Sequence, residues 1–368
     1  WALWSNFKLT YEGKNVDALM EVIASTTETM ERYLENNVDN MPENKHAEIN
    51  ALIEKLTDAA KTKNAEAMWD ALIANNTEFG AVKEYVAVYA DYVAAIEKMS
   101  TTLEDYAASA TDEALADATK YNDIDASSLN KEDLQTLIDN IILTTVKLRL
   151  PKHYNTATDD EPVEMTAMIF APSFEENGSA SSDGWKWNTK ATGDTGVKDN
   201  SNSTYSISNA DGSFVFNTWN KDAVDGGYWV AQSVKELPAG MYELTALVAS
   251  DAGNTISLTA GNDTNSTTLT TPKEQGIDIS VIFAVKEGQD ETEIKVSSNT
   301  WFKADNFRLN YFGSDSQKQP TEIEGTEASN DSTPVSITTL SGVTVKSLVK
   351  GINIITKANG EKVKIYVK

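Results

Sequence analysis

The spacing of apolar residues changes once along this chain, and that change constrains its fold more than any other feature. Between residues 14 and 150 the apolar residues recur every three or four positions. Between residues 165 and 313 they alternate with polar residues, as in the segment 242–248. The first spacing places apolar side chains on one face of a helix, and the second places them on one face of a strand. We therefore predict a multidomain α + β protein in which a helical bundle precedes a β domain.

Two polar stretches divide the chain further. Neither 151–164 nor 314–333 has a hydrophobic period, and both contain proline, so we interpret them as linkers. The 149 residues between them hold short alternating strands separated by turns, which is typical of an antiparallel β-sandwich or jelly roll. The predicted organisation is a helical bundle at 14–150, a linker at 151–164, a β-sandwich at 165–313, a linker at 314–333 and a small C-terminal β module at 334–368.

One spacing pattern occurs twice. The pattern W-x4-N-F-[KR]-L-x-Y-x-G occupies residues 1–13 and again residues 301–313. Its alternating Phe, Leu and Tyr before a glycine indicate a strand that ends in a turn. We expect residues 1–13 to be the last strand of a second sandwich whose body lies upstream.

The charge balance limits the partners. The chain of 368 residues has 31 Lys and Arg against 56 Asp and Glu, which gives a formal net charge of −25. A surface this acidic repels phosphate backbones, so nucleic acid is not an expected partner. Because no stretch approaches 18 consecutive apolar residues, membrane insertion is not expected either. The absence of cysteine and the presence of only two histidines exclude disulfides and thiolate metal sites, and nearly exclude a His-rich metal centre.

Three motifs in the predicted sandwich resemble those of a known family. They are A-P-S-F-E at 171–175 followed by Gly184-Trp185, Q-x4-L-P-A-G-x-Y-x-L at 232–244, and W-x3-D-N-F-R-L at 301–309. In this order they are similar to the galactose-binding-domain-like carbohydrate-binding modules of secreted bacterial glycoside hydrolases. The resemblance implies a jelly-roll fold and a structural Ca²⁺ that joins the first and last strands. The matching positions for that ion are Glu175, Asp305 and Ser173.

The C-terminal segment carries a second resemblance. Residues 341–368 hold alternating Val and Ile with turns and six lysines against one acidic residue. This segment is similar to the C-terminal sorting domains of type IX secretion, although Val343 stands where that family usually has Arg or Lys. The resemblance implies export and a secreted or cell-surface location.

Tryptophans are the candidate sugar-binding residues. A sugar stacks its apolar C–H face on an indole ring while amides and carboxylates bind its hydroxyls. Trp187, Trp219 and Trp301 lie beside stretches rich in Asn and Gly, with Asn188, Asn220 and Asp225 as polar neighbours. The alternative is that these rings fill the core, as we expect for Trp185 and Trp229.

Paired acids for glycoside hydrolysis are not evident in the sequence. Glu243 and Glu293 fall on predicted strands where the alternation assigns them to solvent faces. We therefore expect a non-catalytic carbohydrate-binding region of an exported polysaccharide-processing protein, with a glycan and other domains of the same larger protein as partners. The alternative is a structural or adhesion-type surface protein whose sandwich contacts protein partners or acts as a spacer.

Overall fold

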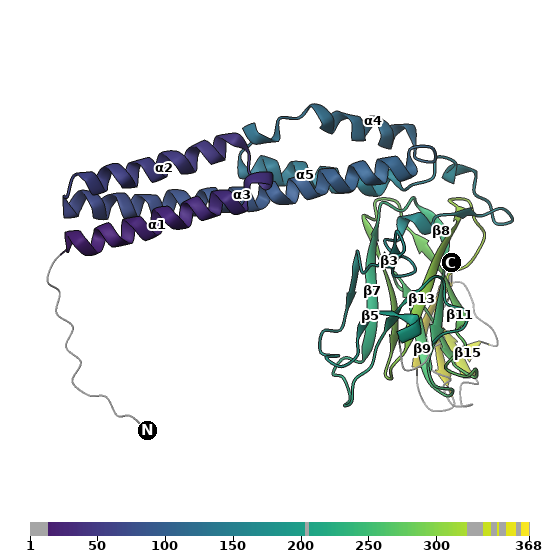
Figure 1. The fold of residues 1–368 in the computed structure, drawn as a ribbon. Coiled ribbons are helices and arrows are strands. Elements are labelled where there is room, and N and C mark those ends of the chain that lie inside the picture. The colour runs from purple at the N-terminus through teal and green to yellow at the C-terminus, as the bar shows by residue number, and fades with distance from the viewer. Residues whose placement is uncertain are drawn as a thin grey trace, which may run out of the picture. The chain divides into compact units, whose positions relative to one another are not determined.

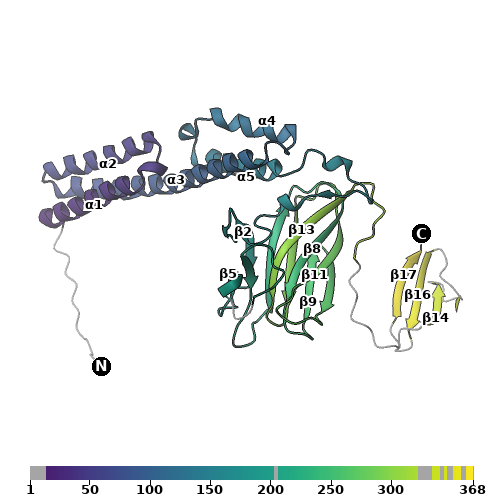
Figure 2. The same cartoon turned by 45° about the vertical axis from the view of Figure 1, so that its right-hand side comes forward.

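The computed structural model describes residues 14–202 and 206–321, together with four C-terminal strands. The chain divides into two compact units, Trp1–Asn155 and Thr156–Lys368. Figures 1 and 2 show helices in the first unit and β-sheets in the second, which confirms the predicted α + β class. The strand predicted at residues 1–13 lies outside the described residues.

Helix α3 organises the first unit. It is 42 residues long, and its first half packs with α1 and α2 around one apolar core, while its second half packs with α4 and α5 around another. Side chains of Asn15, Asn64, Thr111 and Asn130 accept backbone N–H groups at helix starts, which satisfies donors that a helix leaves unpaired. No helix in the described part of the chain is long and apolar enough to cross a membrane. The helices are α1 (Val16–Asn36), α2 (Glu43–Lys61), α3 (Ala65–Tyr106), α4 (Asp112–Lys120) and α5 (Lys131–Leu148).

Gly80 lies in the interior of α3. A Cβ atom built there would meet no other atom within 4 Å. Alanine is more favourable than glycine in a helix interior by about 1 kcal/mol. The free energy of unfolding of the Gly80→Ala variant should therefore be about 1 kcal/mol higher than that of the wild-type chain. Denaturant titration of the helical circular dichroism signal measures it.

The matched control is Gly178→Ala in the turn between β2 (Glu175–Glu176) and β3 (Ser179–Ala180). Gly178 has a φ of +73°, so alanine is strained there and should give no gain. An unchanged or lower stability of Gly80→Ala would contradict the expectation for α3.

Two antiparallel sheets form the sandwich of the second unit. The six-stranded sheet has the order β11-β8-β13-β6-β5, with β1 also paired to β13, and the five-stranded sheet has the order β10-β9-β12-β7-β4. Strands β2 (Glu175–Glu176) and β3 (Ser179–Ala180) form a separate hairpin. The sheet strands are β1 (Val163–Glu164), β4 (Trp185–Trp187), β5 (Gly196–Asp199), β6 (Phe214–Asn217), β7 (Tyr228–Lys235), β8 (Gly240–Ala249), β9 (Thr255–Ala260), β10 (Asp263–Thr268), β11 (Ile277–Val285), β12 (Glu291–Ser298) and β13 (Lys303–Gly313).

An aromatic cluster lies between the two sheets. The Phe174 ring centroid is 5.0 Å from that of Trp185, 5.5 Å from that of Phe216 and 6.0 Å from that of Phe307. All four side chains are buried. The cluster therefore joins the motif at 171–175 to the closing strand β13.

The sandwich extends beyond the expected residues 165–313. Strand β1 pairs with β13 through Val163 and Tyr311. Asp159 accepts hydrogen bonds from Ser316 and from the backbone of Gln317. The ends of the two polar stretches thus contact the sandwich and each other. Hydrogen bonds hold them there in place of apolar contacts, so the absence of a hydrophobic period did not mark them as separate linkers.

The C-terminal region forms a four-stranded antiparallel sheet, whose strands are the yellow arrows in Figure 2. The strand order is β15-β14-β16-β17. Their bounds are β14 (Pro334–Thr339), β15 (Thr344–Val345), β16 (Gly351–Lys357) and β17 (Lys362–Val367). Strands β16 and β17 pair antiparallel to each other.

Candidate functional site

Two loops meet at one end of the sandwich. Residues 188–195 join β4 to β5, and residues 218–227 join β6 to β7. The backbone N–H of Trp219 donates to the hydroxyl of Thr195 at 3.3 Å, and that hydroxyl lies 3.3 Å from the Trp219 carbonyl oxygen. Thr218 is bonded to the backbone of Phe302 through both its hydroxyl and its N–H group. The loop that carries Trp219 is therefore fixed to its neighbour and to the closing strand.

Trp219 presents its indole ring to solvent. Its exposed fraction is 48%, and it is the one exposed aromatic side chain among residues 156–202 and 206–321. A Cβ atom at Gly193 would lie 2.4 Å from the Trp219 carbonyl oxygen, so only glycine lets the first loop pass this close to the second. The indole thus stands on a tightly packed backbone.

Polar side chains surround this end of the sandwich. The Asn217 amide donates to the Asp194 carbonyl oxygen at 2.5 Å and to its carboxylate at 3.2 Å. Lys198 forms an ion pair of 2.9 Å with Asp194. The amide of Asn220 donates to the carbonyl oxygen of Asp222 at 2.9 Å. An exposed ring beside a carboxylate, an ammonium group and an amide can contact both the apolar face and the hydroxyls of a polyol.

Beneath these groups lies a buried lysine that sequence reasoning missed. Lys303 on β13 is 1% exposed, and burial lowers its pKa to about 8, with the charge of Asp194 acting in the opposite direction. Because lysine is almost never fully buried in proteins, the sequence alone predicts an exposed side chain at position 303. Asp194 and Lys198 were likewise not predicted, since their roles depend on the pairing of β5 with β6.

The other two candidate tryptophans are half-buried. Trp187 pairs with Val230, which is buried, and its ring centroid is 5.6 Å from that of Phe216. The indole N–H of Trp301 donates to the Asp251 carboxylate at 3.0 Å. Their rings therefore contribute less open surface than that of Trp219.

Asn188 and Asp225 stabilise the loop from within. Asn188 is buried, and its amide donates to the carbonyl oxygens of Asp225 and Gly227 at 2.9 and 2.6 Å. The Asp225 carboxylate pairs with Lys190. These contacts tie the two loops together, and both residues remain predictions as sugar ligands.

The two acids considered for catalysis belong to different layers. Glu243 lies on β8 in the six-stranded sheet, and Glu293 lies on β12 in the five-stranded sheet. A general acid and base must face each other across one cleft, so this pair has no such arrangement.

The predicted calcium residues lie together near the aromatic cluster. Asp305 is fully buried, and its Oδ2 accepts the backbone N–H of Asp211 at 2.7 Å. Its Oδ1 has no hydrogen-bond partner. Burial, helped by the charges of Asp211 and Glu175 and opposed by backbone hydrogen bonds, raises the pKa of Asp305 to about 8. The hydroxyl of Ser173 donates to the Asp211 carboxylate at 2.6 Å.

These donors fit a hard cation in kind. All are oxygens, as Ca²⁺ requires, and a cation would relieve both the unpaired Oδ1 of Asp305 and its repulsion by Glu175. Among the described residues, however, no group of three acidic, His or Cys side chains is arranged as a metal centre. Backbone or hydroxyl oxygens would therefore have to supply the remaining ligands.

Comparison with known proteins finds partial likenesses to solved structures. No family model matches the chain, and no curated protein matches it significantly. One similar structure is a module described as TmCBM61 in complex with beta-1,4-galactotriose, with 22% identity over 39% of this chain and 96% of that one, at a TM-score of 0.30. Another is the CBM22-1 xylan-binding domain of Paenibacillus barcinonensis Xyn10C, with 15% identity over 39% and 92% of the two chains, at a TM-score of 0.26. The β-sandwich fold rests on its own strand pairings.

Proposed function

We propose that this chain is a non-catalytic glycan-binding region of an exported polysaccharide-processing protein, and that the sugar binds at Trp219. The observation that carries the proposal is the exposed indole of Trp219, held between two mutually bonded loops beside Asp194 and Asn220. The three sequence motifs support the carbohydrate-binding class. The resemblance of residues 341–368 to sorting domains supports export.

Physical chemistry favours a sugar at such a site. The C–H face of a pyranose is apolar and matches an indole ring in size, while its hydroxyls require donors and acceptors at the ring edge. Asp194 and Lys198 offer both kinds of group within one ion pair. Because the loops are already bonded to each other, binding need not order them, which lowers its entropic cost.

Affinity gel electrophoresis tests the proposal. The folded chain should migrate more slowly in gels that contain a soluble polysaccharide such as a galactan or xylan than in gels without it. The Trp219→Ala variant should migrate equally in both. Unchanged migration of the wild-type chain across a panel of neutral and acidic polysaccharides would count against glycan binding and favour a surface that contacts protein partners.

We also propose that Asp305 and Glu175, with Ser173 nearby, hold a structural Ca²⁺. The unpaired, buried Oδ1 of Asp305 supports this. A bound ion stabilises the folded state by mass action, by about 2.7 kcal/mol at one hundred times its Kd. Millimolar Ca²⁺ should therefore raise the melting temperature of the sandwich in calorimetry, and EDTA should reverse the rise.

The Asp305→Asn variant is the matched control, because it keeps the shape of the side chain and removes its charge. Its melting temperature should not respond to Ca²⁺ or EDTA. Equal melting of the wild-type chain in both solutions would exclude the ion.

A further inference from the structure

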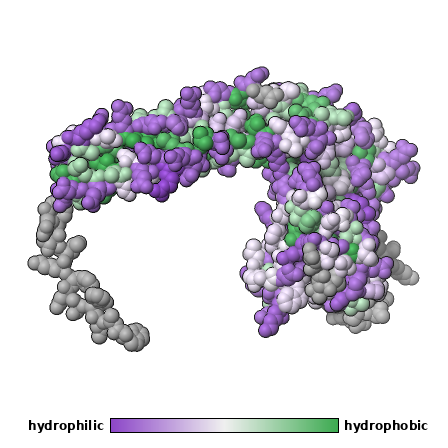
Figure 3. Space-filling view, viewed as in Figure 1, coloured by the Kyte–Doolittle hydropathy of each residue, from purple (hydrophilic) through white to green (hydrophobic). Residues whose placement is uncertain are grey.

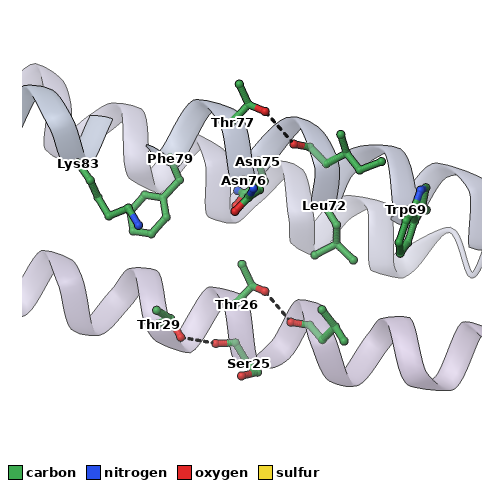
Figure 4. A pocket seen from close by; sticks show the side chains of 12 residues that line it. Ser25, Thr26, Thr29, Trp69, Leu72, Asn75, Asn76, Thr77, Phe79 and Lys83 are labelled. Carbon is green, nitrogen blue, oxygen red and sulfur yellow. Dashed lines mark hydrogen bonds between the residues drawn. The ribbon is translucent and has the colours of Figure 1, made fainter. Parts of the chain in front are cut away.

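A groove runs between α1 and α3 in the helical unit, far along the chain from the proposed sugar site. Its volume is about 510 Å³. Figure 4 shows Trp69, Leu72 and Phe79 of α3 on one wall and Thr26 and Thr29 of α1 on the other. Phe79 and Leu72 also belong to the core of α1, α2 and α3, whereas Trp69, Ile73 and Val22 lie outside it and are exposed.

The groove walls follow the spacing of a helix-packing surface. On α3, Trp69, Ile73 and Asn76 lie at positions i, i+4 and i+7, beside the separate stripe that faces the core. Trp69 and Ile73 are 44% and 53% exposed, and Val22 on α1 is 50% exposed. Figure 3 shows apolar residues in green reaching the surface along the helical unit. Two such adjacent stripes form the surface on which a further helix packs.

Gly80 continues the same stripe, four residues after Asn76. Glycine in a helix interior lowers stability, yet the space around a Cβ at this position is open. The chain itself therefore gives no packing reason for glycine. A second backbone that approaches α3 closely at this point would give one.

Asn75 supplies a buried polar group on the groove floor. It is 4% exposed and lines the groove. Its amide nitrogen lies 3.6 Å from the sulfur of Met30, and its Oδ1 has no hydrogen-bond partner. Buried amide oxygens in proteins are normally paired, so this oxygen beneath the groove is a polar group that the helical unit itself leaves unsatisfied.

Three threonine hydroxyls of the walls can also accept hydrogen bonds. The hydroxyls of Thr26, Thr29 and Thr77 already donate to carbonyl oxygens of their own helices. They thus present methyl groups and oxygen lone pairs to the groove. An occupant with small or apolar side chains and N–H donors matches this lining.

Charge identifies the occupant further. By helical spacing, Glu21 flanks the groove on the outer side of α1 and Asp70 flanks it on α3. Two further acids at these borders are already paired, Glu28 with Arg32 and Glu66 with Lys14. Lys83 stands at one end, over the ring of Phe79. A second copy of this chain would bring two bodies of net charge −25 together, which electrostatic repulsion opposes.

We propose that the groove between α1 and α3 binds a basic amphipathic helix of a partner protein. The small and apolar face of that helix packs on the stripe that contains Ile73 and Gly80, and Lys or Arg side chains along its flanks pair with Glu21 and Asp70. The inference is independent of glycan binding by the sandwich.

A synthetic 18-residue peptide tests this proposal. It carries Leu and Ala on one face and Lys on both flanks, and its matched control carries Glu in place of Lys. Calorimetric titration of the full chain should show saturable one-to-one binding of the Lys peptide, and at least tenfold weaker binding of the Glu peptide. Equal affinity for the two peptides, or no binding of the Lys peptide, would overturn the proposal.

Two variants separate the groove from general electrostatic attraction. Gly80→Leu keeps the charge of the chain and fills the approach point, and Ile73→Glu adds a negative charge at an exposed position. Each should weaken binding of the Lys peptide at least tenfold while helical circular dichroism stays unchanged. Unchanged affinity in Gly80→Leu, or tighter binding in Ile73→Glu, would assign the binding to charge alone and contradict the groove. A dimer in sedimentation that Ile73→Glu dissociates would replace the proposed partner with a second copy.

Discussion

Replacing Phe174 by alanine is expected to lower the free energy of unfolding of the sandwich by about 3–5 kcal/mol, the range for deleting a buried aromatic ring. Phe174 is fully buried and contacts the rings of Trp185, Phe216 and Phe307. Its backbone has a φ of +56°, which alanine would share, so the substitution relieves no strain. No relief of backbone strain therefore offsets the stability lost with the ring contacts.

Denaturant titration monitored by tryptophan fluorescence measures this effect, because Trp185 reports on the cluster directly. Phe174→Leu is the matched control, and it should lose much less stability since it keeps most of the apolar volume. A cost below about 1 kcal/mol for Phe174→Ala would mean that the aromatic cluster does not hold the two ends of the sandwich together.

The Trp219→Ala variant is expected to bind a glycan ligand about 10- to 100-fold more weakly than the wild-type chain. A stacked indole contributes through buried apolar area and ring contact, about 1.5–3 kcal/mol together, and each 1.4 kcal/mol changes Kd tenfold. Because the side chain is 48% exposed, the melting temperature should stay within about 2 °C of the wild-type value. Calorimetric titration with the retained polysaccharide measures the affinity.

Trp69→Ala is the matched control for this effect. Trp69 is 44% exposed, close to the value for Trp219, but it lies on α3 in the other unit of the chain. Glycan affinity should not change in this variant. Equal losses in both variants would show that binding follows general tryptophan exposure and not the loop site.

The broad fold could be predicted because it depends on local spacing. The change of apolar period separates helices from strands, and the alternation in the segment 242–248 coincides with the interior strand β8. Linker ends were harder to predict, since the pairing of Val163 with Tyr311 joins residues 148 positions apart. Such pairings depend on tertiary contacts that no local window contains.

The candidate site could be predicted only in part for the same reason. Composition pointed to Trp219, yet it pointed equally to Trp187, whose inward direction follows from its register against Val230 on β7. The burial of Lys303 depends on the strands on either side of β13. The surroundings of Asp305 likewise depend on a distant segment, because its Oδ2 accepts the backbone N–H of Asp211, 94 residues earlier.

A glycan array probed with the folded chain and with its Trp219→Ala variant tests whether the sandwich binds a glycan through Trp219. The wild-type chain should retain at least one glycan, and the variant should lose it while its melting temperature is unchanged. Retention of no glycan by the folded wild-type chain, or equal retention by the variant, would rule out glycan binding at Trp219.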